Sequence, residues 1–122
     1  MKIKVIIAIG IICLLMAGCK SSREAFLEEY MLVADEIVRL VDTNPTAAGV
    51  AQAQAYLDSK KASLKSKFNA GKSAGQDKEM ENKFRVIVPA YLKKVAGLSE
   101  KHPNLKTDLD RLTEDFGEFL LK

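Results

Sequence analysis

The sequence predicts an all-α fold, an up-down-up-down four-helix bundle formed by residues 23–122. Apolar residues recur at alternating spacings of three and four in four successive segments, which is the period of a helix that faces a core. No segment sustains the period of two that strands require. The connections between the segments are short, and short connections favour antiparallel neighbours in a bundle.

The first helix is expected over residues 23–42, with Ser21 and Glu24 at the spacing of a capping box. Two apolar rows run along it side by side and make a wide apolar face, so this helix should lie deep in the core. The two rows are Phe26, Tyr30, Val33, Ile37 and Leu40, and Leu27, Met31, Ala34, Val38 and Val41.

The second helix is expected over residues 45–69, with Pro45 at its first position, where proline is tolerated. Its first half is rich in alanine, which has high helix propensity. Lys60 and Lys61 interrupt the apolar row, and residues 69–76 are expected to form a flexible loop. The inward residues are Ala53, Leu57, Leu64 and Phe68.

The third helix is expected over residues 77–100, with Pro89 inside it. Proline removes the hydrogen bond to the carbonyl four residues earlier, so a kink is expected over residues 85–89. A short strand over residues 86–88 is the alternative. The apolar row of this segment is Met80, Phe84, Ile87, Tyr91, Val95 and Leu98.

The fourth helix is expected over residues 104–121 and has the clearest pattern. Its apolar residues step by four and three, as on one face of a helix. They are Leu105, Leu109, Leu112, Phe116 and then Phe119 or Leu120.

The N-terminus has the three parts of a secretory signal, so residues 1–18 are expected to be a signal peptide. Lys2 and Lys4 give a charged start, an apolar run covers residues 5–18, and Ala17-Gly18 is a small-residue pair. The run is about 14 residues, whereas a spanning helix needs roughly 20.

Met16-Ala17-Gly18-Cys19 resembles the lipobox of bacterial lipoproteins, with Met16 where that family usually has leucine. The resemblance implies that Cys19 is acylated and begins the mature chain, leaving residues 19–22 as a lipid-anchored tether. It also implies a place in the cell envelope. Lys20, rather than aspartate, points to the periplasmic face of the outer membrane if the host has two membranes. An uncleaved signal anchor and a cleaved signal with a free thiol are the alternatives.

Composition limits the function of the mature chain. Cleavage before Cys19 leaves 104 of the 122 residues, enough for one small domain, and no thiol besides Cys19. Removing Lys2 and Lys4 leaves 17 basic residues against 16 acidic ones. A net charge this close to zero argues against nucleic acid as a partner.

The sequence contains no recognisable catalytic or metal-binding pattern, so we expect neither an enzyme nor a cofactor. His102 is the only histidine and lies beside Pro103 in a loop. Zinc sites and Ser-His-Asp triads need further ligands or partners that the sequence does not place near it. Haem attachment of the c type would need Cys-x-x-Cys-His, which is absent.

Two functions fit these observations. The first is a membrane-anchored envelope lipoprotein that acts as a structural or protein-interaction module, with an envelope protein or anionic lipid headgroups as partner. The second is a small-ligand carrier with a pocket between helices, opened at the Pro89 kink and at the Lys60-Lys61 interruption. Four occupied apolar rows leave little room for a cavity, which favours the first function.

Five lysines in the second half of the second helix and the loop after it form a candidate membrane-surface patch, with an ordinary solvated face as the alternative. No acidic residue interrupts them. The first helix should run away from the membrane and the second should return, which places these lysines at the membrane-proximal end of the domain. Basic residues near an anionic surface attract it. The patch comprises Lys60, Lys61, Lys65, Lys67 and Lys72.

Overall fold

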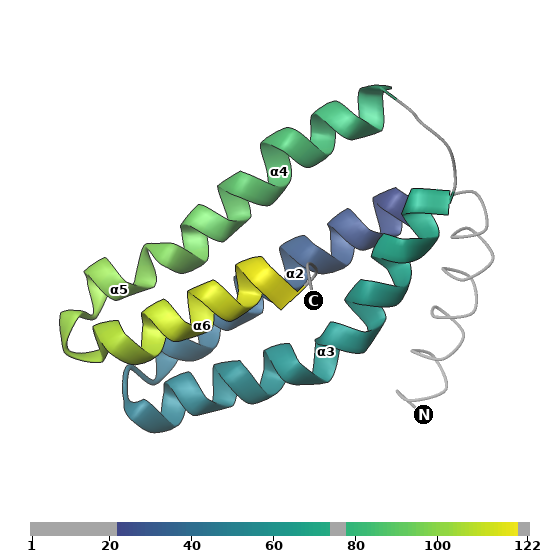
Figure 1. Ribbon diagram of the computed structural model, residues 1–122. Helices are drawn as coiled ribbons and strands as arrows, with labels where there is room; N and C mark the ends of the chain where they lie inside the picture. The colour runs from purple at the N-terminus through teal and green to yellow at the C-terminus, as the bar shows by residue number, and fades with distance from the viewer. Residues whose placement is uncertain (1–21, 74–77, 120–122) are drawn as a thin grey trace, which may run out of the picture.

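The computed structural model describes residues 22–73 and 78–119, and these confirm the all-α class (Figure 1). No strand occurs in these two ranges, so residues 86–88 are helical and the strand alternative is wrong. The elements are α2 (Ser22–Thr43), α3 (Ala47–Ser73), α4 (Lys78–Ala96), α5 (Leu98–Lys101), the 3-10 turn η1 (Pro103–Leu105) and α6 (Lys106–Glu118).

Helix α2 is the centre of the packing, as its wide apolar face predicts. It contacts α3 on one side and α4 on the other, and α6 packs against both α3 and α4 (Figure 1). Helices α2 and α4 run in the same direction, because Phe26 stacks on Phe84 near the start of both helices and Asp35 pairs with Lys94 further along both.

The core is formed by the apolar rows that the sequence predicts. Phe26, Ile37, Leu57, Leu64 and Phe116 are all completely buried. No polar or charged residue is buried among the described residues. Burial of large apolar side chains is therefore the main source of stability here, at about 1.5–3 kcal/mol for each fully buried one.

Helix α3 differs from the prediction at both ends. Pro45 is not its first residue: Thr46 precedes the helix, and its Oγ1 accepts a hydrogen bond from the Gly49 N–H at 3.2 Å. This is an N-cap, which satisfies a backbone donor that lacks a helical partner. At the other end α3 continues to Ser73, so the predicted loop at 69–76 is wrong over residues 69–73.

The predicted third helix is divided at Gly97. Helix α4 ends at Ala96, and the short α5 follows before Pro103 begins η1. Glycine has the lowest helix propensity after proline, which makes it a natural point of interruption. Pro89 lies within α4 and is exposed. The kink expected at Pro89 stays a prediction.

Helix α6 is shorter than α2, α3 and α4, so one end of the described domain has three helices instead of four (Figure 1). We call this the three-helix end. It is formed by residues 22–29 of α2, 65–73 of α3 and 78–88 of α4. Phe119, which follows α6, is only 2% exposed and belongs to the hydrophobic core.

Candidate functional site at the three-helix end

Three phenylalanine rings fill the three-helix end, one from each helix. The ring centroid of Phe26 lies 5.3 Å from that of Phe68 and 5.4 Å from that of Phe84, and the last two are 6.4 Å apart. Aromatic pairs at such distances attract each other beyond their burial. Phe26 is fully buried, whereas Phe68 and Phe84 are half-buried. The cluster therefore closes the core while leaving apolar surface at its edge.

Below this cluster the aromatic packing continues into the four-helix part. Tyr30 lies 5.5 Å from Phe26 and stacks on Phe116 of α6 at 4.6 Å between ring centroids. Burial raises the pKa of the Tyr30 hydroxyl to about 12, because the phenolate would lose its hydration. Tyr30 and Phe116 both belong to apolar rows that the sequence predicts, and both are buried.

A cavity of about 190 Å³ lies beside the phenylalanine cluster and is half open to solvent. Its apolar wall is made by Phe68 and Phe84. Its rim carries two cations and one carboxylate. The lining residues are Arg23, Lys67, Phe68, Gly71, Glu81 and Phe84.

Arg23 and Gly71 join α2 to α3 at the edge of this cavity. The Arg23 Nε donates a hydrogen bond to the Gly71 carbonyl oxygen at 2.9 Å. A Cβ atom on residue 71 would lie 2.7 Å from the Arg23 Cγ, so glycine allows this close approach. The terminal guanidinium nitrogens of Arg23, which lines the cavity, are not used in this hydrogen bond.

The predicted lysine patch lies on both flanks of the buried row of α3. On the α2 side the Lys67 Nζ lies 2.6 Å from the Glu29 Oε2, which also accepts a hydrogen bond from the Ser63 hydroxyl. On the α6 side the Lys61 Nζ lies 2.6 Å from the Asp115 Oδ2. Lys67 and Lys61 thus have interhelical carboxylate partners.

The other members of the patch have different surroundings. The Lys60 ammonium lies 5.8 Å from the centroid of the Tyr56 ring, a cation–π distance. Lys65 is half-buried. Lys72 belongs to α3, but its side chain lies outside the described residues, as do Cys19 and the predicted capping residue Ser21.

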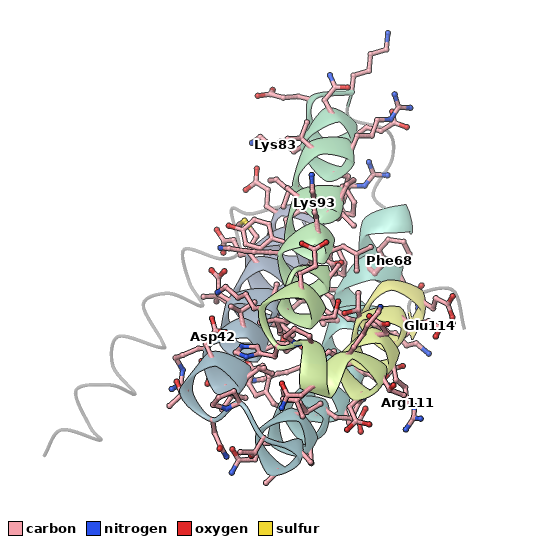
Figure 2. All side chains as sticks on the ribbon, turned by 90° about the vertical axis from the view of Figure 1, so that its left-hand side faces the viewer. Asp42, Phe68, Lys83, Lys93, Arg111 and Glu114 are labelled. Atoms are coloured by element: carbon pink, nitrogen blue, oxygen red, sulfur yellow. The ribbon has the colours of Figure 1, made fainter. Side chains whose placement is uncertain are left out.

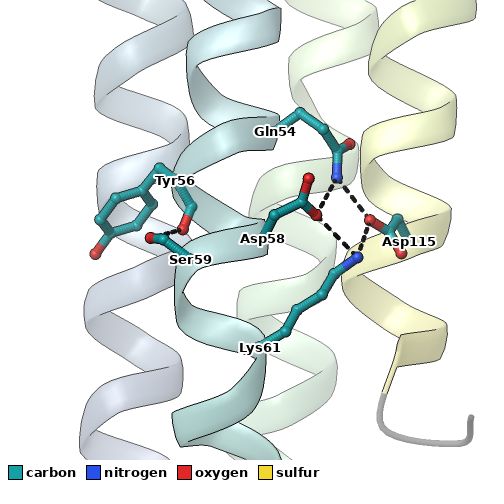
Figure 3. Close-up of polar contacts among 6 residues, drawn as sticks. All are labelled: Gln54, Tyr56, Asp58, Ser59, Lys61 and Asp115. Atoms are coloured by element: carbon teal, nitrogen blue, oxygen red, sulfur yellow. Dashed lines mark hydrogen bonds and ion pairs between the residues drawn. The ribbon is translucent and has the colours of Figure 1, made fainter.

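A polar network explains why lysine interrupts the apolar row of α3 (Figure 3). The Gln54 Nε2 donates to the Asp58 Oδ1 at 3.0 Å and to the Asp115 Oδ2 at 2.6 Å, and Lys61 contacts both carboxylates. Partial burial lowers the pKa of Lys61, but its hydrogen bonds to Asp115 and Asp58 outweigh this and raise the pKa above its ordinary value. The network holds α3 and α6 together. Sequence periodicity could not show this pairing, because it relates residues within one helix only.

A second polar contact closes the opposite end of the domain, where Asp42 lies (Figure 2). The His102 Nε2 is 3.0 Å from the Asp42 Oδ1, and the Lys101 Nζ is 3.1 Å from Oδ2. The hydrogen bond from His102, and then Lys101, lowers the pKa of the Asp42 carboxyl. A lowered pKa means that the contact stabilises the fold at neutral pH and loses this effect as the pH falls through that pKa.

Over residues 22–73 and 78–119, no group of three His, Cys, Asp or Glu side chains could hold a metal ion. None of the helices there is long and apolar enough to cross a membrane. Comparisons with protein-family models, with curated proteins and with solved structures gave no match.

Proposed function

We propose that the protein is a lipid-anchored module of the bacterial cell envelope, with a structural or protein-interaction role. In this proposal residues 1–18 are a signal peptide, Cys19 carries the lipid, and the helical domain of residues 23–122 contacts an envelope protein. The observation that carries it is Met16-Ala17-Gly18-Cys19 after a charged start and an apolar run. Lys20 supports the outer membrane as the destination in a host with two membranes.

The anchor would also orient the domain. Helix α2 begins at Ser22, three residues after Cys19. Three extended residues span at most about 10–11 Å, so the three-helix end would lie close to the membrane surface. An up-down-up-down order of the helices belongs to the same proposal, since it returns the end of α3 and the start of α4 to that surface.

Replacing the lipid site tests this proposal directly. Cys19→Ser should leave unprocessed precursor, because the residue that takes the lipid is lost. Mass spectrometry of the wild-type protein should show an acylated cysteine at the N-terminus. Cys13→Ser is the matched control, since Cys13 would leave with the signal peptide. Recovery of an intact chain beginning at Met1 as the main wild-type species would contradict the proposal.

The lysine patch is proposed to orient the domain on anionic headgroups. Because Lys61 and Lys67 have carboxylate partners, Lys60 and Lys65 should contribute most. Each basic residue near such a surface contributes about 1 kcal/mol, so replacing Lys60 and Lys65 by glutamine should weaken binding of residues 20–122 to anionic vesicles about 30-fold.

Vesicle sedimentation at two salt concentrations measures this effect, since screening should reduce the wild-type binding. The matched control replaces Lys93 of α4 and Lys106 of α6, which are not part of the lysine patch on α3, by glutamine and should bind as wild type does. Equal binding of the wild type to neutral and anionic vesicles would contradict this proposal and would show that the lysines form an ordinary solvated face.

A small-ligand carrier is the second candidate function, and the cavity of about 190 Å³ favours it. The cavity differs in place from the pocket expected from the sequence. Its lining includes neither Pro89 nor the Lys60-Lys61 interruption. It exists because α6 stops before the other three helices do (Figure 1).

A further inference from the structure

The cavity at the three-helix end has the size and the wall of a site for part of an apolar chain. An apolar cavity of roughly 150 Å³ accepts a benzene molecule. The present cavity of about 190 Å³ is larger, and two phenylalanine rings form its apolar wall. Its open side lets a longer molecule continue to the surface. A linear chain of which only the end is buried fits this shape better than a compact ligand does.

The polar rim favours an anionic group at the other end of such a chain. The Arg23 Nε is held by the Gly71 carbonyl, which positions the guanidinium at the cavity. Lys67 also lines the rim and shares its charge with Glu29. Glu81 is the one carboxylate of the lining and lies 3.8 Å from Arg85 of its own helix. Arg23 therefore has the donors that match a carboxylate or phosphate.

We propose that the three-helix end binds a single-chain anionic amphiphile, with its chain end against Phe68 and Phe84 and its anionic group on Arg23. The proposal assigns a ligand class to the carrier function above and rests on that function. It does not require acylation of Cys19. The proposed ligand is a free amphiphile, because a lipid joined to the Cys19 sulfur has no anionic group to pair with Arg23.

Photolabelling of the full-length protein in membranes tests the proposal. The probe is a ten-carbon fatty acid with a diazirine at its chain end, and the labelled peptides are identified by mass spectrometry. Labelling is expected within residues 67–71 and 81–84. Decanoate should compete at least tenfold better than decanol, because only decanoate can pair with Arg23. Better competition by decanol would keep a carrier but overturn the anionic ligand class.

Variants separate the two halves of the site. Phe84→Trp fills the cavity and should reduce labelling at least fivefold, whereas Val86→Trp, on the exposed side of α4, should not change it. Arg23→Gln should remove the preference for decanoate, and Arg23→Lys should restore part of it. The Arg23 variants leave the aromatic cluster unchanged, so they remain informative if Phe84→Trp does not fold.

The source of the chain is read from Cys19→Ser. Increased labelling of this variant would show that a lipid on Cys19 occupies the cavity in the wild type. Unchanged labelling would show that a free amphiphile does so. Only the second result supports the proposed ligand class, because a lipid joined to the Cys19 sulfur has no anionic group for Arg23. Labelling spread over the outer helix faces, or equal labelling of wild type and Phe84→Trp with its fold intact, would overturn the proposal.

Discussion

Replacing Phe116 by alanine is expected to lower the free energy of unfolding by about 3–5 kcal/mol, the usual cost of removing a buried phenylalanine. Phe116 is completely buried and stacks on Tyr30 at 4.6 Å, so the substitution leaves a cavity where α6 meets α2. Small domains are stable by only about 5–15 kcal/mol. The variant should therefore unfold at a clearly lower urea concentration, measured by circular dichroism.

Leu32→Ala is the control for this experiment. Leu32 is also a large apolar residue within a helix, but its side chain is 67% exposed on α2. Its removal should change the free energy of unfolding by no more than about 0.5 kcal/mol. An unchanged urea midpoint for Phe116→Ala would show that α6 is not docked on α2 in solution.

Sequence periodicity predicted the helices and their inward faces well, because both follow from local rules. Leu57 and Leu64 are completely buried despite Lys60 and Lys61 between them, since side chains seven apart lie on one helix face. The helix ends were less predictable. That α3 begins at Ala47, with Thr46 as its N-cap, rather than at Pro45 depends on a single hydrogen bond from the Gly49 N–H.

The candidate site could be predicted only in part, because it depends on where helices end relative to one another. The sequence indicated apolar residues at Phe68 and Phe84, yet nothing in their spacing showed that α6 would stop below them. The parallel packing of α2 and α4, seen in the contacts Phe26–Phe84 and Asp35–Lys94, is equally a property of the assembled domain. Periodicity shows which face of a helix points inward, but it does not show which other helix packs against that face.

The lysine patch shows the same limit for charged residues. Five lysines without an intervening acid suggested one positive surface, because a linear sequence shows only the charges nearby along the chain. The carboxylates of Glu29 and Asp115, from two other helices, lie 2.6 Å from Lys67 and Lys61. A charge run in one helix therefore overstates the field at its surface whenever the neighbouring helices carry the opposite charge.

Among the glycines of the described part of the chain, Gly49 is the one at which alanine is expected to lower the free energy of unfolding most. A Cβ atom at residue 49 would lie 1.7 Å from the carbonyl oxygen of Asn44 and 2.9 Å from its carbonyl carbon. Both are backbone atoms of the connection between α2 and α3, so they cannot rotate away as a side chain can. The connection must move, although its Thr46 N–H donates to this same carbonyl oxygen at 2.8 Å.

The expected loss in the free energy of unfolding is about 1–3 kcal/mol, the typical cost of overpacking. Alanine has a higher helix propensity than glycine by roughly 1 kcal/mol. The expected loss is what remains after this gain is subtracted from the cost of the steric clash. Gly97→Ala is the matched control. Its Cβ would meet the carbonyl oxygens of Lys93 and Lys94 at 3.5 Å, an ordinary contact, and its backbone already has helical angles of φ −64° and ψ −16°.

Gly97→Ala should therefore raise the free energy of unfolding by about 0.4–1 kcal/mol, because alanine restricts the unfolded chain more than glycine does. Urea titration of the two variants beside the wild type measures both effects, with opposite signs expected. A Gly49→Ala variant as stable as Gly97→Ala would mean that the Asn44 carbonyl does not face residue 49. The N-cap at Thr46 and the close return of α3 along α2 would then need a different geometry.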